Sequence, residues 1–153
     1  MTGRRGFTLV EILIVVTILG ILAAIVVPQF SSATDAAKRT TLVKNLHTVR
    51  KQIELYRYQH NGDVPAAEGE ASADFERRLT AQTDVLGAAG AQYGPYLERL
   101  PANSFNGLDT VRVGGAVAGA NSDGWRFDPT TGEFQADDGF DADNDGAADH
   151  VTL

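Results

Sequence analysis

The sequence predicts an α+β protein in which one long N-terminal helix, over 7–60, carries a small antiparallel sheet of three or four strands. Three observations predict it. Residues 7–27 form an almost unbroken apolar run, residues 42–56 carry an apolar stripe at helical spacing, and short alternating segments with turn residues follow residue 110. With 153 residues, the chain is long enough for one membrane span and one small domain.

The apolar run is long enough to cross a bilayer. As a helix, the segment from Phe7 to Val27 would extend about 31 Å, close to the thickness of the hydrocarbon core. Arg4 and Arg5 precede it, and basic residues stay on the cytoplasmic side, so we expect the chain after Val27 to lie outside the cytoplasm. Glu11 is the one charged residue of the run. Because a lone carboxylate in lipid is unfavourable, we expect it to have a partner.

Three interpretations of this N-terminus compete. A secretory signal peptide shares the basic start, but an acid so early in the apolar run argues against it, and the one later cleavage site, at 31–33, is weak. A plain anchor explains the length and leaves Glu11 without a role. The third interpretation accounts for every part. The hexapeptide Gly6-Phe7-Thr8-Leu9-Val10-Glu11, with the run behind it, resembles the class III signal of type IV pilins and type II secretion pseudopilins.

That resemblance implies a route of processing and assembly. Prepilin peptidase would cut between Gly6 and Phe7 on the cytoplasmic side, and the new amino group of Phe7 would be N-methylated. Glu11 corresponds to the acidic residue of the family that pairs with the N-terminal amine of a neighbouring subunit. An ammonium group offsets the desolvation of a buried carboxylate, which favours such a pair. The alternative for Glu11 is an acid at the membrane surface that reaches water.

The resemblance also implies a division of the chain: a leader over 1–6, a transmembrane and assembly helix over 7–28, its amphipathic continuation over 29–60, and a periplasmic domain over 61–153. Five apolar residues spaced by four and three form the stripe of the continuation: Leu42, Leu46, Val49, Ile53 and Tyr56. The residues between them form a face that we expect to be solvated: Lys44, Asn45, Arg50, Lys51, Gln52 and Glu54. Pro28 predicts a kink, and Asn61-Gly62 predicts the end of the helix.

The domain after the helix is expected to begin with a connection over 63–106. A short helix is predicted over 73–81, with Phe75 and Leu79 as its apolar contacts. Tyr93 and Tyr96 lie in a proline-rich stretch near Pro95. We expect these two tyrosines to be core or subunit-contact residues and not a platform for a ligand.

Strands are predicted over 110–113, 124–127 and 132–135. The last two flank a turn over 128–131 and so predict a hairpin. Trp125 and Phe127 alternate toward one face, which we expect to be buried against the stripe of the long helix.

The acidic tail over 137–150 contains a second chemical signal. Five of its residues follow D-x-D-x-D-G-x-x-D, the spacing with which alternate residues supply oxygens to calcium: Asp141, Asp143, Asp145, Gly146 and Asp149. Ala147 would add its backbone carbonyl. Thr152 stands where a full EF-hand loop has glutamate, so the match is partial, and resemblance to major pseudopilins, which commonly bind calcium in a C-terminal loop, adds to it. The alternative is a solvated acidic tail, and His150 is expected to be exposed.

Composition excludes several classes. The net charge of −7 argues against a nucleic-acid binder, and His47, His60 and His150 are scattered, with no cysteine and no motif of a nucleophile, so no enzyme is predicted. The absence of cysteine fits major pseudopilins better than pilins that close a C-terminal disulfide. We therefore expect a pseudopilus subunit in the bacterial inner membrane, with copies of itself, minor pilins, prepilin peptidase and the assembly platform as partners. A type IV pilin of a surface fibre and a calcium-binding module that does not polymerise are the alternatives.

Overall fold

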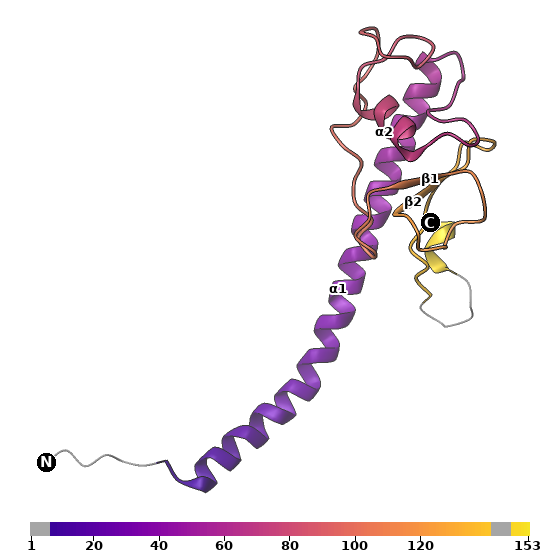
Figure 1. Cartoon of the computed structure of the whole chain (residues 1–153). Helices are drawn as coiled ribbons and strands as arrows, with labels where there is room; N and C mark the ends of the chain where they lie inside the picture. Colours follow the sequence, from indigo (N-terminus) through magenta and orange to yellow (C-terminus); the bar gives the residue numbers. More distant parts are fainter. Residues whose placement is uncertain (1–6, 142–147) are drawn as a thin grey trace, which may run out of the picture. The chain divides into compact units, whose positions relative to one another are not determined.

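The computed structural model describes residues 7–141 and 148–153. Two helices, three short strands and a final 3-10 turn follow in chain order (Figure 1): α1 (Leu9–Gln59), α2 (Ser72–Thr80), β1 (Val111–Val113), β2 (Trp125–Phe127), β3 (Phe134–Ala136) and η1 (Asp149–Thr152). The chain divides into two compact units, residues 1–37 and residues 38–153. The predicted α+β class and the long N-terminal helix are confirmed, and α1 differs from the predicted helix by two residues at its start and one at its end.

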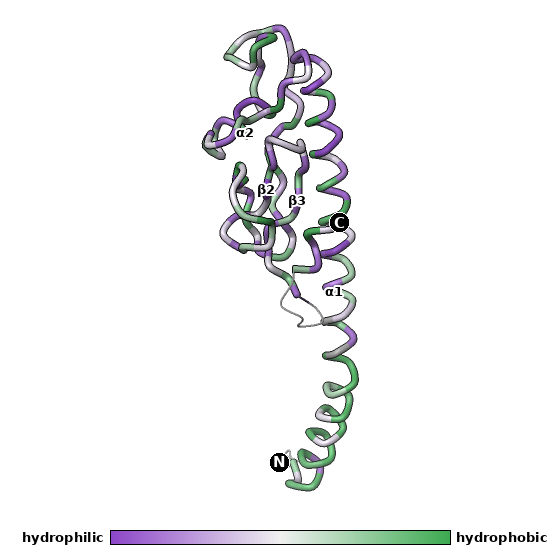
Figure 2. Tube along the Cα trace, turned by 90° about the vertical axis from the view of Figure 1, so that its right-hand side faces the viewer, coloured by the Kyte–Doolittle hydropathy of each residue, from purple (hydrophilic) through white to green (hydrophobic). Residues whose placement is uncertain are grey.

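The part of α1 in the first unit contains a long segment, from Ile12 to Val27, that is apolar on every side. Each residue from Leu9 to Val27 is exposed, and this part of α1 is mostly green, the colour of hydrophobic residues, in Figure 2. Thr17 and Thr34 donate their hydroxyl hydrogens to the carbonyls four residues earlier, at 2.7 and 2.8 Å, so these polar groups need no outside partner. Within the described chain, α1 holds one segment long and apolar enough to cross a membrane.

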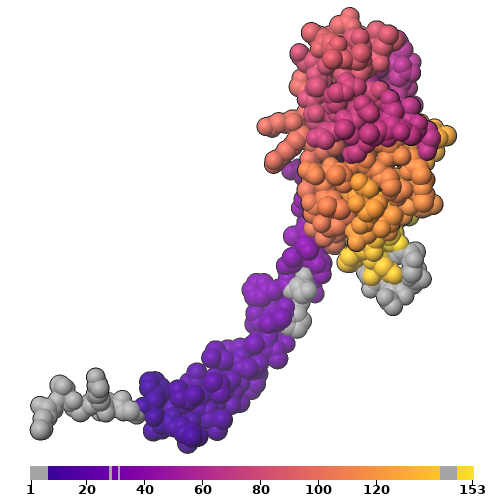
Figure 3. Space-filling view, in the orientation of Figure 1, coloured from indigo at the N-terminus to yellow at the C-terminus, as the bar shows by residue number. Residues whose placement is uncertain are grey.

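The part of α1 in the second unit forms one wall of the core. All five predicted stripe residues are at most 1% exposed, and they pack with Phe75 and Leu79 of α2 and with Trp125, Phe127 and Phe134 of the sheet. In the space-filling view, segments that follow residue 60 cover this part of α1 on the side that faces the viewer (Figure 3). The predicted stripe, the short helix and the burial of Trp125 are therefore confirmed.

The end of α1 is set by local backbone chemistry. Asn61 and Gly62 both adopt positive φ, 58° and 96°, and the amide of Gly62 donates to the carbonyl of Arg57 at 2.8 Å. This is the hydrogen-bond pattern of a Schellman motif, which satisfies a carbonyl that the helix itself leaves unpaired. The helix ends where Asn61-Gly62 predicted.

The sheet has the order β1-β2-β3, and its two pairings differ in direction. β2 and β3 form the predicted antiparallel hairpin, closed by a turn in which the amide of Gly132 donates to the carbonyl of Asp128 at 2.7 Å. β1 pairs parallel to β2, with Val111 opposite Trp125. The prediction of a purely antiparallel sheet is therefore wrong. The segment over 114–124 is much longer than a hairpin turn, and this length permits the chain to cross back before it pairs.

Candidate functional site

The first turn of α1 holds the residues of the predicted assembly site. Thr8 lies directly before the helix, and its hydroxyl oxygen accepts a hydrogen bond from the amide of Glu11 at 3.2 Å. This is an N-cap, and the spacing Thr8-x-x-Glu11 is that of a capping box. The same spacing is visible in the sequence, and it gives Glu11 a place in the helix cap beside its predicted role in assembly. The cap fixes Glu11 in the first turn, where the helix dipole also favours a carboxylate.

Phe7 and Glu11 are both exposed in the described chain, Phe7 to 75%. Phe7 precedes the N-cap residue Thr8 in the chain, and Glu11 follows it. Gly6, the other residue of the predicted cleavage site, is outside the described residues. The arrangement presents a carboxylate at the head of a helix whose apolar surface, from Ile12 to Val27, no described residue covers. Such a surface is stable only in lipid or among other chains.

The acidic tail begins inside the domain. Asp137 is fully buried, and its carboxylate accepts hydrogen bonds from Arg112 at 2.8 and 3.1 Å and from the amides of Gly119 and Ala120 at 2.7 and 3.0 Å. The hydrogen bond to Asp137 raises the pKa of Arg112 above its ordinary value. The alternative of a solvated tail is therefore wrong for Asp137, because four donors from remote segments replace water around its carboxylate.

His150 is 2% exposed, so the expectation that it faces solvent is wrong. Its Nδ1 lies 2.9 Å from a carboxylate oxygen of Asp138, whose other oxygen accepts from the side-chain amide of Asn103 at 2.7 Å. The imidazole stacks on the ring of Phe140 with centroids 4.7 Å apart, and Phe105 packs against it. His150 can be buried because the carboxylate of Asp138 satisfies its ring nitrogen and the rings of Phe140 and Phe105 pack against the imidazole.

These contacts join the two ends of the predicted calcium loop. The amide of Asp149 donates to the carbonyl of Phe140 at 2.7 Å, so Asp141, which follows Phe140, and Asp149 begin and end the loop at paired backbone positions. Asp143, Asp145 and Ala147 lie outside the described residues. Among the described residues, no group of three or more acidic or histidine side chains is arranged to hold a metal ion.

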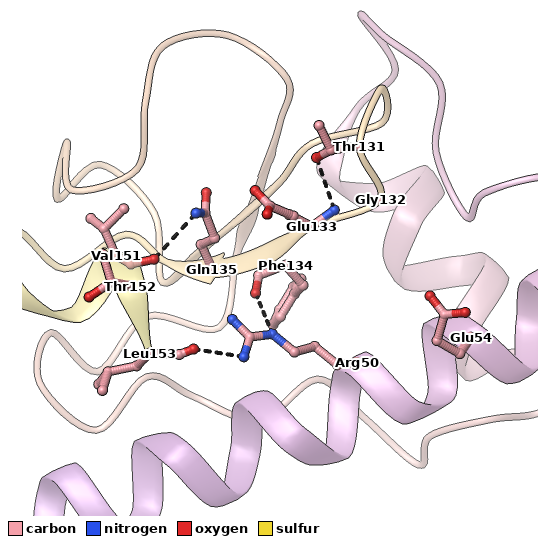
Figure 4. A pocket seen from close by; sticks show the side chains of 10 residues that line it. All are labelled: Arg50, Glu54, Thr131, Gly132, Glu133, Phe134, Gln135, Val151, Thr152 and Leu153. Atoms are coloured by element: carbon pink, nitrogen blue, oxygen red, sulfur yellow. Dashed lines mark hydrogen bonds between the residues drawn. The ribbon is translucent and has the colours of Figure 1, made fainter.

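Arg50 lines a pocket of about 600 Å³ (Figure 4). Its guanidinium donates to the backbone oxygens of Phe134 at 2.9 Å and Leu153 at 2.7 Å, and Glu54 and Glu133 also line the pocket. Burial lowers the pKa of Arg50 from its ordinary value. The expectation that Arg50 belongs to a solvated face is wrong. Because the carbonyls of β3 and of the last residue need donors, the side chain turns from the helix toward them.

The two other histidines differ in burial. His60 is buried and stacks on Tyr56 with centroids 3.7 Å apart, with Nδ1 2.8 Å from the carbonyl of Tyr56 and Nε2 3.0 Å from the hydroxyl of Thr83. Tyr93 contacts the imidazole edge-on, and Tyr96 packs against the core. The tyrosines are thus part of the packing, as predicted. His47 is exposed.

The N-terminal helix has a charge-free segment headed by one acid, and its amphipathic continuation carries a small sheet. These features together define the class of membrane-anchored, pilin-like proteins. Residues 1–27 match the family described as the prokaryotic N-terminal methylation motif. The type II secretion system core protein G of Klebsiella pneumoniae is 33% identical over 105 residues, 69% of this chain and 71% of the relative. The protein of the same name from Escherichia coli is 30% identical over 117 residues, 76% of this chain and 77% of the relative.

The chain therefore belongs to the family of type II secretion system core protein G, the major pseudopilins. A part of it is also similar to the type IV wide pilus major component of Thermus thermophilus, at 38% identity over 61 residues, 40% of this chain and 47% of the relative. No solved structure matches the chain.

Proposed function

We propose that this protein is the repeating subunit of a type II secretion pseudopilus. The observation that carries the proposal is the exposed apolar helix from Ile12 to Val27, headed by Glu11, which no described part of the chain covers. In a filament the same surface is buried among the helices of other copies. The relatives named type II secretion system core protein G support the assignment to that machine.

Before assembly, the subunit crosses the inner membrane once. Arg4 and Arg5 hold the N-terminus in the cytoplasm, and residues 38–153 lie in the periplasm. Prepilin peptidase cuts between Gly6 and Phe7, and the amino group of Phe7 is methylated and keeps its charge. The match of residues 1–27 to the N-terminal methylation motif supports this processing. Minor pilins and the inner-membrane assembly platform complete the list of partners.

Glu11 pairs with the amine of Phe7 in a neighbouring subunit. The carboxylate is exposed in the single chain and fixed in the first turn by the Thr8 cap, so it is available to another copy. In lipid, an unpaired carboxylate and an unpaired ammonium are each unfavourable, and one contact between subunits removes both penalties. The pair thereby favours a single register of assembly.

The test separates assembly from helix capping. Glu11→Ala is expected to insert in the membrane normally and to yield no sheared filaments, as measured by immunoblot of membrane and filament fractions. Thr8→Ala is the matched control, because it removes the cap and keeps the carboxylate, and filaments should still form. Filaments from Glu11→Ala at the wild-type yield would contradict the proposal. The intact mass, expected to begin at Phe7 with one added methyl group, tests the processing separately.

A surface type IV pilus is the second candidate, favoured by the similarity to the Thermus thermophilus pilus component. Deletion of the gene distinguishes the two. Loss of protein export with surface fibres intact supports the pseudopilus, and loss of surface fibres with export intact supports the pilus.

We propose further that the loop over 141–149 binds calcium through Asp141, Asp143, Asp145, the carbonyl of Ala147, and Asp149. The paired ends of the loop, where the amide of Asp149 donates to the carbonyl of Phe140, support it, because they bring the first and last ligands together before the ion binds. Oxygen ligands at alternate positions suit a hard cation.

Calcium that binds only the folded chain raises the free energy of unfolding, by about 2.7 kcal/mol at a hundredfold excess over Kd. The melting temperature should therefore rise when calcium is added. Asp143→Ala and Asp145→Ala should lose that increase, and Glu76→Ala, an exposed acid on α2, should keep it. Equal melting of the wild type in calcium and in chelator would exclude the site.

A further inference from the structure

The face of α1 opposite the core displays four residues at helical spacing: Lys44, Lys51, Leu55 and Tyr58. We call this face the outer stripe. Tyr58 is 87% exposed, Leu55 is 42% exposed, and both lysines are exposed. An aromatic ring and a leucine beside two lysines give a helix face both apolar area and positive charge, a combination common at interfaces.

The charge of the folded domain is divided along the sequence. Residues 38–57 contain six lysines and arginines and one acidic residue, and residues 58–153 contain five basic and seventeen acidic residues. No ion pair among the described residues involves Lys44 or Lys51. The outer stripe is therefore a cationic surface on an acidic protein, and its charges are available to a partner.

A complementary surface lies elsewhere on the same domain, in a hollow of about 480 Å³. Glu98 and Asp109, both exposed, contribute carboxylates, and 100–102 contribute apolar groups, with Arg99 as the one basic residue of the lining. We call it the acidic hollow. Two hydrogen bonds hold its backbone in place. The indole of Trp125 donates to the carbonyl of Pro101 at 2.8 Å, and the side-chain amide of Asn45 donates to the carbonyl of Ala102 at 3.3 Å.

We propose that the outer stripe of one copy docks in the acidic hollow of the next copy. The lysines face the carboxylates of Glu98 and Asp109, and the side chains of Leu55 and Tyr58 cover the apolar floor. The inference rests on the proposed filament, to which it adds a contact between folded domains. Because the two surfaces differ, the contact is heterologous and repeats from copy to copy, so it generates an open helical array and not a closed dimer.

The chain has no cysteine, so introduced cysteines report contacts without background. In filaments of Lys51→Cys/Glu98→Cys, a short bismaleimide should produce a ladder of covalent oligomers. A spacer is needed because the Cα atoms of an ion pair lie farther apart than a disulfide spans. Lys51→Cys/Glu76→Cys is the matched control, with an exposed acid on α2, and it should give no ladder.

Charge reversal provides an independent readout. Lys51→Glu should weaken the contact about fivefold, the scale of one exposed ion pair, and reduce the filament yield, and Glu98→Lys in the same chain should restore the yield. High salt should reduce the wild-type yield and leave a Lys51→Leu variant less affected. Melting of each variant checks that its fold is intact.

The outcomes separate the inference from the proposed function. If Lys51→Cys/Glu98→Cys forms filaments but cross-linking gives no ladder of oligomers, or only a covalent dimer, the inference is overturned. The proposed filament function would still stand. A wild-type chain that is processed and inserted but gives no filaments would refute the proposed function itself. A ladder together with rescue by the reversed pair supports both.

Discussion

The two parts of α1 differ in what covers their apolar side chains. From residue 38 onward, one stripe is covered by the rest of the chain, and Leu46 is 1% exposed. From Ile12 to Val27 the helix is apolar on every side, and Leu19 is 57% exposed. Both parts have the same backbone structure. A helix that is hydrophobic on every side needs lipid or other chains to cover its apolar surface. A helix with a single apolar stripe can bury that stripe against its own domain.

The largest expected effect tests this contrast with the same substitution in each part. Leu46→Ala should destabilise the folded domain by about 3 kcal/mol, because it removes buried methyl groups and leaves a cavity. Leu19→Ala should leave the unfolding midpoint of the domain unchanged. Both are measured by tryptophan fluorescence of the full chain in detergent with denaturant. Equal losses would show that residues before 38 also contribute to the core of the single chain.

The next prediction concerns the buried carboxylate of Asp137. Asp137→Ala should cost about 3 kcal/mol, because Arg112 and two amides lose the group that satisfies them. Glu76→Ala, which removes an exposed carboxylate, should change stability by less than about 0.5 kcal/mol. A double variant with Arg112→Ala should be less destabilised than the sum of the two single variants. An additive result would mean that the pair is not coupled.

The third prediction compares a buried histidine, His150, with an exposed one, His47. His150→Ala should destabilise by about 2 kcal/mol, because Asp138 loses its partner and the rings of Phe105 and Phe140 lose a stacked neighbour. His47→Ala, on the exposed face of α1, should have no measurable effect. Melting temperatures of the two variants check this. A loss at His47 as large as that at His150 would contradict the burial.

The smallest effect is a dependence on acid. The hydrogen bond from Arg78, at 2.9 Å, and one from the amide of Ala67 lower the pKa of Glu70 to about 2. Because the folded pKa lies below the ordinary value, the stabilisation is complete above about pH 4.5 and is lost as the pH falls through about 2. Glu70→Gln should remove this part of the acid sensitivity and cost less than about 1 kcal/mol at pH 7, since the pair is partly exposed. Identical acid unfolding of wild type and variant would refute it.

Much of the fold could be predicted because its signals are local. The spacing of Leu42 to Tyr56, the αL pair Asn61-Gly62 and the turn after Asp128 each specify a structure within a few residues. The capping box of Thr8 and Glu11 is equally local, although the resemblance to prepilins explains Glu11 by assembly alone. The direction of β1 could not be predicted, since two strands of three residues with a long connection permit either pairing.

By itself, the sequence determined the long helix, its charge-free segment from Ile12 to Val27, the apolar stripe of its second part and the N-terminal signal with Glu11. The tertiary structure decided which charged residues lie inside. Asp137 meets Arg112 across 25 positions, Asp138 meets Asn103 across 35, and Arg50 meets Leu153 across 103. A carboxylate or guanidinium is buried only where donors or acceptors converge on it, and here those partners come from segments that are far apart in the chain.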